Sequence, residues 1–334
     1  SIFKAYDTEK HVDVAIKVEK RQGKCYLDKE VLFYATLERY RRPEVMRAAP
    51  RCHYSGVEGG FKIAVFDLMG DSLSDLFYRC GRRFSLKCVL MLAQQLISRL
   101  ESVHEAGIVH RDVKPGNFVM GRGGDAGNVY VIDFGLSNLW RSAGKHIAFN
   151  TESPFRGTHR YASVNAHNKF EQSRRDDLEA IAYVLVYFLK GGLPWQSLKV
   201  SRNKRRKAIG KFKASISPEM LCTGLPFQFT EFLIYVKALA FDQTPDYEYC
   251  RALFRTAFEE HMFEDNGVWD WDLIPAGTAL APPALQGQQQ ASVVVPGAHS
   301  NSAAVMVAAA AAAAAASHAS MGSATTTAEE IIPT

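Results

Sequence analysis

Hydrophobic and polar residues alternate over residues 12–19, VDVAIKVE. In an extended chain the three valines and the isoleucine fall on one face, and the other four residues, Lys17 included, fall on the opposite face. This period of two predicts a β-strand that carries a lysine on its less apolar face. The apolar stretch GFKIAVFDLMG predicts a second strand over residues 60–70.

Three stretches show the helical period instead. Residues 27–39 place apolar side chains three and four positions apart, which predicts a helix shortly after the first strand. From Ser85 an apolar stripe continues to Val103, with Ser85 as the N-cap and Gly107 as the stop signal. Residues 177–189, DLEAIAYVLVYFL, are apolar nearly all round, which predicts a helix buried on every side. Its 13 residues are too few to span a membrane.

Composition separates the end of the chain from the rest. Of all 334 residues, 47% are hydrophobic and 22% charged, which is typical of a globular protein with a sizeable core. Residues 274–334 consist mainly of Ala, Gln, Ser, Thr, Gly and Pro, with a run of nine alanines over residues 308–316. Such a composition cannot build a packed core and predicts a disordered tail, with at most a transient helix in the alanines.

Charge and cysteine usage limit the classes of partner. The net charge of +5, from 40 basic and 35 acidic residues, fits an acidic or phosphorylated partner. It is too small and dispersed for a nucleic-acid surface. The six cysteines form no CxxC pair, which indicates reduced thiols and a cytoplasmic protein. The chain starts at Ser1 without a signal sequence, and we interpret it as a segment of a longer protein.

The stretch HRDVKPGN, residues 110–117, brings Asp112, Lys114 and Asn117 within six positions. Phosphoryl transfer needs metal ions, a cation for the phosphates and a carboxylate that orients the attacking hydroxyl. Asp112 has the position of that carboxylate, Asn117 has the spacing of a second magnesium ligand, and Lys114 lies near the path of the γ-phosphate. DFG follows the predicted buried strand in NVYVIDFG, residues 128–135, so Asp133 is the candidate ligand of the magnesium that bridges the phosphates.

A second group of candidates lies near the N-terminus. VAIK at residues 14–17 places Lys17 on the first strand, where it could reach the α and β phosphates, and Glu30 on the next helix could hold it by an ion pair. Taken singly, each feature has an ordinary interpretation: HRD as a turn, Lys17 as a solvated strand residue and Asp133 as a cap. Their occurrence in a fixed order, each on the predicted element, favours phosphoryl transfer.

With these motifs the chain resembles the eukaryotic protein kinases over residues 1–273. GTHRYASVN, residues 157–165, stands where most kinases have an APE motif, and in this the chain is similar to the casein kinase 1 family. Further segments similar to that family are RFSLKCVLMLAQQLISRLESVHEAGIVHRDVKPGNF, EQSRRDDLEAIAYVLVYFLKGGLPWQSL and PDYEYCRALF. The flanks FRGT and VNAH are also similar to the tau-tubulin kinases, the second choice within the superfamily.

The resemblance implies an α+β, two-lobed protein kinase fold and a monomeric catalytic domain. Residues 1–69 would form a small β-rich lobe, truncated at its start because Ile2 matches the apolar position just after the glycine-rich loop. Residues 70–273 would form a larger helical lobe, with ATP and Mg²⁺ between the two and residues 274–334 as the disordered tail. The residues implied to contact the nucleotide and its metal are Ile2, Ala15, Lys17, Glu30, Phe66, Asp67, Met69, Asp75, Asn117 and Asp133. Among them Phe66 would be the gatekeeper, the backbone of Asp67 and Met69 would hold adenine, and Asp75 would lie near the ribose.

The resemblance also implies a site for phosphate groups on substrates that are already phosphorylated. Arg160 belongs to it, together with one or more of Lys204, Arg205 and Arg206 in the basic run NKRRK. That run has two further interpretations, a nuclear import signal, which would add a nuclear location, and a plain solvated face. By the same resemblance Asp177 braces the catalytic loop, and Arg251 lacks the APE glutamate with which it would pair.

Together these features predict a serine/threonine kinase that uses Mg-ATP and acts on acidic or phosphate-primed proteins, without nucleic-acid or membrane partners. By family resemblance, no activation-loop phosphorylation is needed. The alternative is a catalytically weak pseudokinase scaffold, which would be expected to lack Lys17, Asp112 or Asp133, whereas all three are present. A small-molecule phosphotransferase of similar fold would lack the substrate-groove segments in residues 157–177, and these are present as well. Gly116 replaces an acidic residue common in the family's catalytic loop.

Overall fold

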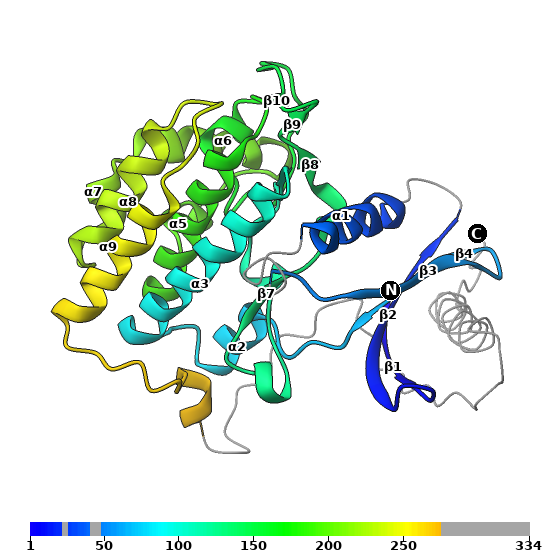
Figure 1. Cartoon of the computed structure of the whole chain (residues 1–334). Helices are drawn as coiled ribbons and strands as arrows, with labels where there is room; N and C mark the ends of the chain where they lie inside the picture. The colour runs from blue at the N-terminus through cyan, green and yellow to red at the C-terminus, as the bar shows by residue number, and fades with distance from the viewer. Residues whose placement is uncertain (22–25, 41–47, 275–334) are drawn as a thin grey trace, which may run out of the picture. The chain divides into compact units, whose positions relative to one another are not determined.

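The computed structural model describes residues 1–21, 26–40 and 48–274 (Figure 1). The predicted disordered tail, apart from residue 274, lies outside the described residues. The described residues form two compact units. One contains residues 1–21, 26–28 and 52–68, and the other contains residues 29–40, 48–51 and 69–274.

The first unit is built on an antiparallel sheet with the strand order β1-β2-β4-β3. Its strands are β1 (Ile2–Asp7), β2 (Val12–Lys20), β3 (Cys52–Glu58) and β4 (Phe61–Asp67). The alternation predicted for β2 is confirmed, since Val14, Ile16 and Val18 are buried and pack with Phe3 and Ile63 in one cluster. The intervening residues of β2, from Asp13 to Glu19, are half-buried on the opposite face.

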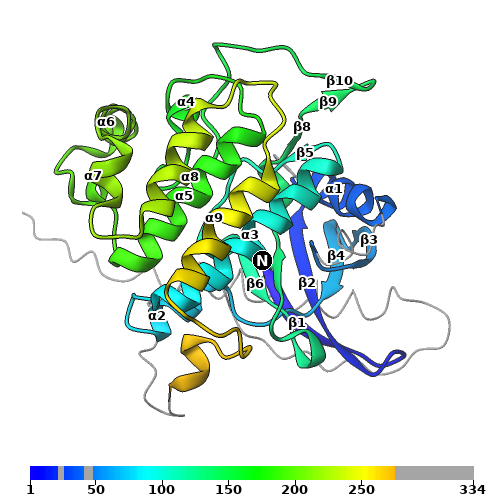
Figure 2. The ribbon, with the colours of Figure 1, turned by 60° about the vertical axis from the view of Figure 1, so that its left-hand side comes forward.

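The second unit is mostly helical. Its helices are α1 (Leu27–Arg39, which begins in the first unit), α2 (Leu73–Arg79), α3 (Leu86–Glu105), α4 (Val164–His167), α5 (Arg174–Lys190), α6 (Arg202–Ser215), α7 (Pro218–Cys222), α8 (Phe227–Ala238) and α9 (Tyr247–Glu260). Helix α3 packs against α5 and α9, and α8 packs against both α5 and α9 (Figure 2). Helix α5 confirms the prediction of a helix buried on every side, because all its residues from Asp176 to Leu189 are buried.

The predicted cap and stop signals of α3 are confirmed. The Ser85 hydroxyl accepts a hydrogen bond of 3.2 Å from the Cys88 amide, which satisfies one of the free amides at the helix start. The helix ends at Glu105, and Gly107 has a φ of +86°, a conformation that glycine adopts without strain.

Short strand pairs connect the helices and support the loops between them. These pairs are β5 (Ile108–Val109) with β8 (Asn138–Leu139), β6 (Phe118–Met120) with β7 (Val129–Val131), and β9 (Arg141–Ser142) with β10 (Lys145–His146). The strand predicted over residues 128–135 is shorter than expected. It ends at Val131 because Asp133 adopts a left-handed conformation, with φ of +68°, and a 3₁₀ turn follows over Phe134–Leu136.

Two further observations concern membrane-spanning helices and cysteines. Among the described residues, no helix combines the length and the apolar character needed to cross a membrane. In this part of the chain the cysteines at positions 80, 88, 222 and 250 are free thiols, whereas Cys25 lies outside the described residues.

Candidate active site

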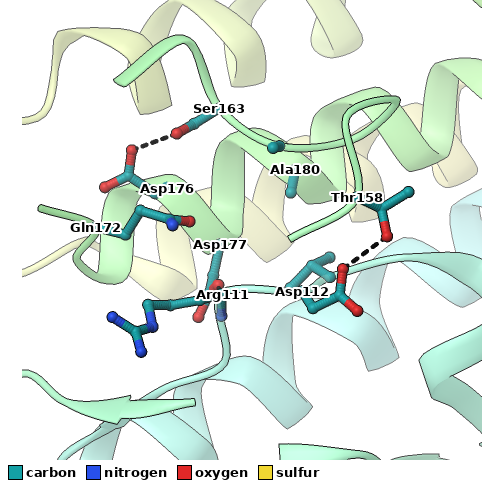
Figure 3. A pocket seen from close by; sticks show the side chains of 10 residues that line it. Arg111, Asp112, Thr158, Ser163, Gln172, Asp176, Asp177 and Ala180 are labelled. Atoms are coloured by element: carbon teal, nitrogen blue, oxygen red, sulfur yellow. Dashed lines mark hydrogen bonds between the residues drawn. The ribbon is translucent and has the colours of Figure 1, made fainter. Parts of the chain in front are cut away.

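The catalytic-loop residues predicted from HRDVKPGN lie together between β5 and β6. Asp112 is 6% exposed, and its Oδ2 accepts a hydrogen bond of 2.6 Å from the Lys114 ammonium. The Asn117 amide nitrogen donates to the Asp112 carbonyl oxygen at 2.9 Å. The other carboxylate oxygen, Oδ1, accepts from the Thr158 hydroxyl at 2.7 Å (Figure 3). The structure therefore brings together the three residues to which the sequence assigns catalysis, and Thr158 contacts the same carboxylate.

Asp177, near the start of α5, holds the backbone of the catalytic loop. Its carboxylate accepts hydrogen bonds from the backbone amides of His110, at 2.7 Å, and Arg111, at 2.8 Å, which confirms the expected bracing role. His104 of α3 contacts the same carboxylate through Nε2 at 2.9 Å, and its Nδ1 lies 2.7 Å from the Tyr247 hydroxyl of α9. Three helices thus fix the position of the catalytic loop.

The protonation states of the buried His104 and Asp177 determine which atoms donate and which accept in these hydrogen bonds. Burial lowers the pKa of His104, so this imidazole is neutral and carries one proton. Because an ionised carboxylate only accepts, we place that proton on Nε2, and Nδ1 accepts from Tyr247. Burial alone would raise the pKa of Asp177, but the hydrogen bonds that its carboxylate accepts from His104 and from the His110 amide outweigh it and lower the pKa. Asp177 is consequently ionised, as a double acceptor of backbone amides requires.

The DFG segment lies directly beside the catalytic loop. The Ile132 amide donates to the Asn117 carbonyl at 2.9 Å, which sets Asp133 next to the end of that loop. Phe134 is fully buried, with its ring 5.0 Å from the ring of Tyr34 in α1 and 5.2 Å from that of His110, both in edge-to-face geometry. This packing fixes the backbone on which Asp133 stands.

The oxygen atoms at this place suit a hard cation such as Mg²⁺. The amide nitrogen of Asn117 donates to Asp112, so its amide oxygen remains available as a metal ligand. Asp133, next to the end of the same loop, supplies a carboxylate. The described residues contain no group of three or more His, Cys, Asp and Glu side chains that could hold a metal. A cation held by Asn117 and Asp133 would take the rest of its coordination from bound phosphates and water.

Gly157 allows the activation segment, by which we mean residues 133–164, to approach the catalytic loop closely. Its φ is +101°, and a Cβ built on it would lie 2.5 Å from the Arg111 carbonyl oxygen. Only glycine fits in this position, and the next residue, Thr158, thereby reaches Asp112. Residues of the loop, of the segment 158–163 and of α5 line one small pocket here (Figure 3).

Arg111, the arginine of HRD, already has an anionic partner. Its guanidinium donates to Glu171 at 3.2 Å and to the carbonyl oxygens of Leu136, at 2.9 Å, and Ser137, at 3.4 Å. Sequence reasoning assigned no role to Glu171 or to Thr158. For Thr158 a signal existed, because a Gly-Thr pair combines the closest possible backbone approach with a short hydroxyl donor. For Glu171 the sequence contained no such signal.

Four of the residues predicted to contact the nucleotide share one face of the sheet in the first unit. Ile2 pairs with Lys17, and Ala15 pairs with Phe66, and directly paired residues of antiparallel strands have side chains on the same face. This face is opposite to the one on which Val14, Ile16 and Val18 are buried. The register therefore lines up the side chains of all four along β1, β2 and β4.

The remaining nucleotide candidates are local features of their own elements. The Asp67 carboxylate pairs with His53 at 2.6 Å, and the contact of its backbone with adenine stays a prediction. Asp75 accepts from the Ser72 hydroxyl at 2.6 Å in a capping box of α2. Glu30 of α1 is buried, and Met69 is half-buried after β4. Lys17 and Glu30 belong to different units, and the ion pair between them stays a prediction.

Arg160 is half-buried against two tyrosines. Its guanidinium donates to the hydroxyls of Tyr161, at 3.3 Å, and Tyr187, at 3.5 Å, and lies over both rings, with 5.6 and 5.4 Å to the ring centres. Cation–π contacts of this kind hold a guanidinium in place while some of its donors remain available.

The three alternatives in the basic run differ in their surroundings. Lys204 is exposed, whereas Arg205 donates to the Gln196 carbonyl at 3.3 Å and Arg206 lies over the Phe155 ring at 5.6 Å. Burial lowers the pKa of His159, and the positive charges of Arg206, Lys213 and Arg205 lower it further. The two arginines therefore lie near residue 159.

Arg251 has partners other than the absent APE glutamate. In α9 it forms an ion pair with Glu101 of α3 and another, at 3.0 Å, with Glu248 of its own helix. The arginine thus joins α9 to α3 and takes no part in holding the activation segment. Gly116 in the catalytic loop faces open space, with no atom within 4 Å of an added Cβ.

One family model matches the part of the chain that contains these elements. The family model described as "Protein kinase domain" matches residues 1–227, more than half of the 334 residues. The matched range contains the antiparallel sheet with α1, the catalytic loop, the DFG segment and the activation segment, and it ends at the first residue of α8.

Proposed function

Because this chain belongs to the protein kinase family and has the protein kinase fold, we propose that it is an active serine/threonine kinase of the casein kinase 1 type. It transfers the γ-phosphoryl group of Mg-ATP to hydroxyl groups of acidic or phosphate-primed proteins. The observation that carries this proposal is the set of contacts around Asp112: the Lys114 ammonium and the Thr158 hydroxyl each donate to its carboxylate, and the Asn117 amide donates to its carbonyl oxygen.

The protein contributes positioning and charge to this reaction. Asp112 accepts the hydrogen bond of the substrate hydroxyl and orients its oxygen for in-line attack. Lys114, whose ammonium is 2.6 Å from Asp112, stabilises the negative charge that develops during transfer. Asp133 and Asn117 would hold the metal, and Lys17 with Glu30 would hold the α and β phosphates. Mg-ATP, when bound, supplies the phosphoryl group and neutralises its charge.

The surroundings of Arg111 and Phe134 support activity without prior phosphorylation. Many kinases need a phosphate on the activation loop, which pairs with basic residues and orders the segment. Here Glu171 already supplies a carboxylate to Arg111, and Phe134 is packed between Tyr34 and His110. The segment is therefore ordered by groups that the chain itself contains.

Fixed positive charge near the activation segment supports acidic or primed substrates. Arg160, Arg205 and Arg206 are half-buried and held by neighbouring groups, so little side-chain entropy is lost when they bind an anion. Arginine also matches phosphate oxygens in a bidentate manner. We assign the phosphate site to these three and not to Lys204, which is exposed. The assignment to the casein kinase 1 type rests on GTHRYASVN in place of an APE motif, with the alternative use of Arg251.

The test is transfer of the γ-phosphoryl group from Mg-ATP to two peptides that differ only in a phosphoserine three residues before the acceptor. Transfer above an Asp112→Asn blank, with preference for the primed peptide, supports both the kinase activity and the phosphate site. Equal use of both peptides would contradict the phosphate site alone. Absence of transfer above the blank, with nucleotide binding retained, would favour the pseudokinase scaffold.

A further inference from the structure

The backbone of residues 160–164, which we name the anchored segment, is held by side chains from three elements. The Trp195 indole, in the 3₁₀ helix η5 (Pro194–Ser197), donates to the Arg160 carbonyl at 2.8 Å. The Lys213 ammonium of α6 donates to the Ala162 carbonyl at 2.6 Å. In α5, Glu179 accepts from the Val164 amide at 2.9 Å. A fourth contact, from the Ser163 hydroxyl to Asp176 at 2.6 Å, is visible in Figure 3.

Lys213 is unusual in this group because it is a lysine with only 1% of its surface exposed. Its ammonium lies 4.5 Å from the ring centre of Tyr183 and 4.8 Å from that of Trp195. The Tyr183 hydroxyl donates to Glu179 at 2.6 Å, so one connected set of side chains surrounds the charge. Burial lowers the pKa of Lys213 to about 7, although the charge of Glu179 acts in the opposite direction.

A buried ammonium is a costly way to fill space in a core, because its charge must be taken out of water. An apolar side chain of similar length would fill the same volume without this penalty. What the ammonium adds is a directed, charge-assisted hydrogen bond to one backbone carbonyl, that of Ala162. The charge of Lys213 therefore acts by holding the anchored segment in its position.

The anchored segment begins two residues after Thr158, which touches Asp112. In the family pattern an ion pair between the APE glutamate and an arginine would hold this part of the chain, but that glutamate is absent and Arg251 pairs with Glu101. We propose that Lys213 is a positioning residue that replaces this ion pair. By holding the Ala162 carbonyl, it fixes the wall against which a peptide substrate binds. This inference rests on the proposed kinase function.

The experiment compares Lys213→Met with Lys211→Met, since Lys211 is an exposed lysine on the same helix. We expect KM for the peptide to rise about tenfold in Lys213→Met, as loss of a charge-assisted hydrogen bond implies. KM for ATP and kcat at saturating peptide should stay within about twofold, because Asp112 and the metal ligands keep their contacts. Trp195→Phe keeps an aromatic ring but removes the donor to Arg160, and should raise KM for the peptide about threefold.

A second readout is independent of activity. Amide hydrogen exchange in residues 160–166 should be faster in Lys213→Met and Trp195→Phe than in the wild type and in Lys211→Met, while exchange in α3 is unchanged. Unchanged KM for the peptide in a folded Lys213→Met variant would overturn the proposal, as would a joint change of both KM values and kcat. If Lys213→Met does not fold, the result with Trp195→Phe decides. If the wild type transfers no phosphate, the kinase function fails, and hydrogen exchange still decides whether Lys213 holds the segment.

Discussion

Replacement of Gly157 by alanine tests whether the close approach of the activation segment to the catalytic loop is needed for catalysis. The added Cβ would lie 2.5 Å from the Arg111 carbonyl oxygen, whereas ordinary contacts begin at 3.4 Å, so the two backbones must separate by about 0.9 Å. The φ of +101° adds strain of about 1–3 kcal/mol for any residue with a side chain. A displacement of about 1 Å in an active site can lower the rate about 100-fold. We therefore expect kcat to fall by roughly that factor.

The assay is kcat for phosphoryl transfer to a saturating peptide, with thermal unfolding to confirm that the variant is folded. Gly144→Ala is the matched control, because Gly144 also has a positive φ, of +77°, but no atom lies within 4 Å of an added Cβ. This control separates backbone strain from the clash and should keep kcat within about twofold. A folded Gly157→Ala variant with the kcat of the control would refute the reasoning.

Three further predictions concern stability. Burial lowers the pKa of His167 from 6.5 to about 4. The neutral His167 contributes its full stabilisation above pH 6.5, and this contribution, about 3 kcal/mol at most, is lost as pH falls through 4. His167→Gln should lack this part of the acid-induced decrease in the free energy of unfolding, as measured by urea unfolding. Parallel curves of this free energy against pH for both proteins would contradict the prediction. Arg251→Ala should lower the free energy of unfolding by about 1–2 kcal/mol, and a double-mutant cycle with Glu101→Gln should show coupling if their ion pair is the cause. Gly116→Asp should leave the Tm within about 2 °C, since the position is open; a larger decrease would show that the glycine is required.

Local patterns predicted the elements whose burial follows a simple period. Helix α1 has the predicted bounds, Leu27–Arg39, and α5 is buried on all sides as its composition indicated. Strand β3, CHYSGVE, was not predicted because it lies at the sheet edge and its residues do not alternate in polarity. Strand β7 ends early because the left-handed Asp133 interrupts an apolar run that reads as continuous.

In the candidate site, residues that lie close together in the sequence could be predicted to act together, whereas contacts between distant positions could not. Asp112, Lys114 and Asn117 are within six positions, so their spacing alone indicated a common role. Thr158 reaches Asp112 across 46 positions, and Arg251 reaches Glu101 across 150. Contacts of this kind depend on how helices and loops pack, and no local period reports them. The positions of Lys213 and Glu179 beneath the activation segment follow from the same packing.

The proposed kinase activity depends above all on Asp112. The most direct measurement is the turnover number for γ-phosphoryl transfer from Mg-ATP by the wild type and by Asp112→Asn, with nucleotide affinity measured for both. We predict transfer by the wild type and a loss of about 100-fold or more in the variant at similar nucleotide affinity, because the substituted amide cannot accept the proton of the substrate hydroxyl. Equal turnover by the two proteins, or no turnover by a wild type that binds Mg-ATP, would contradict the claim.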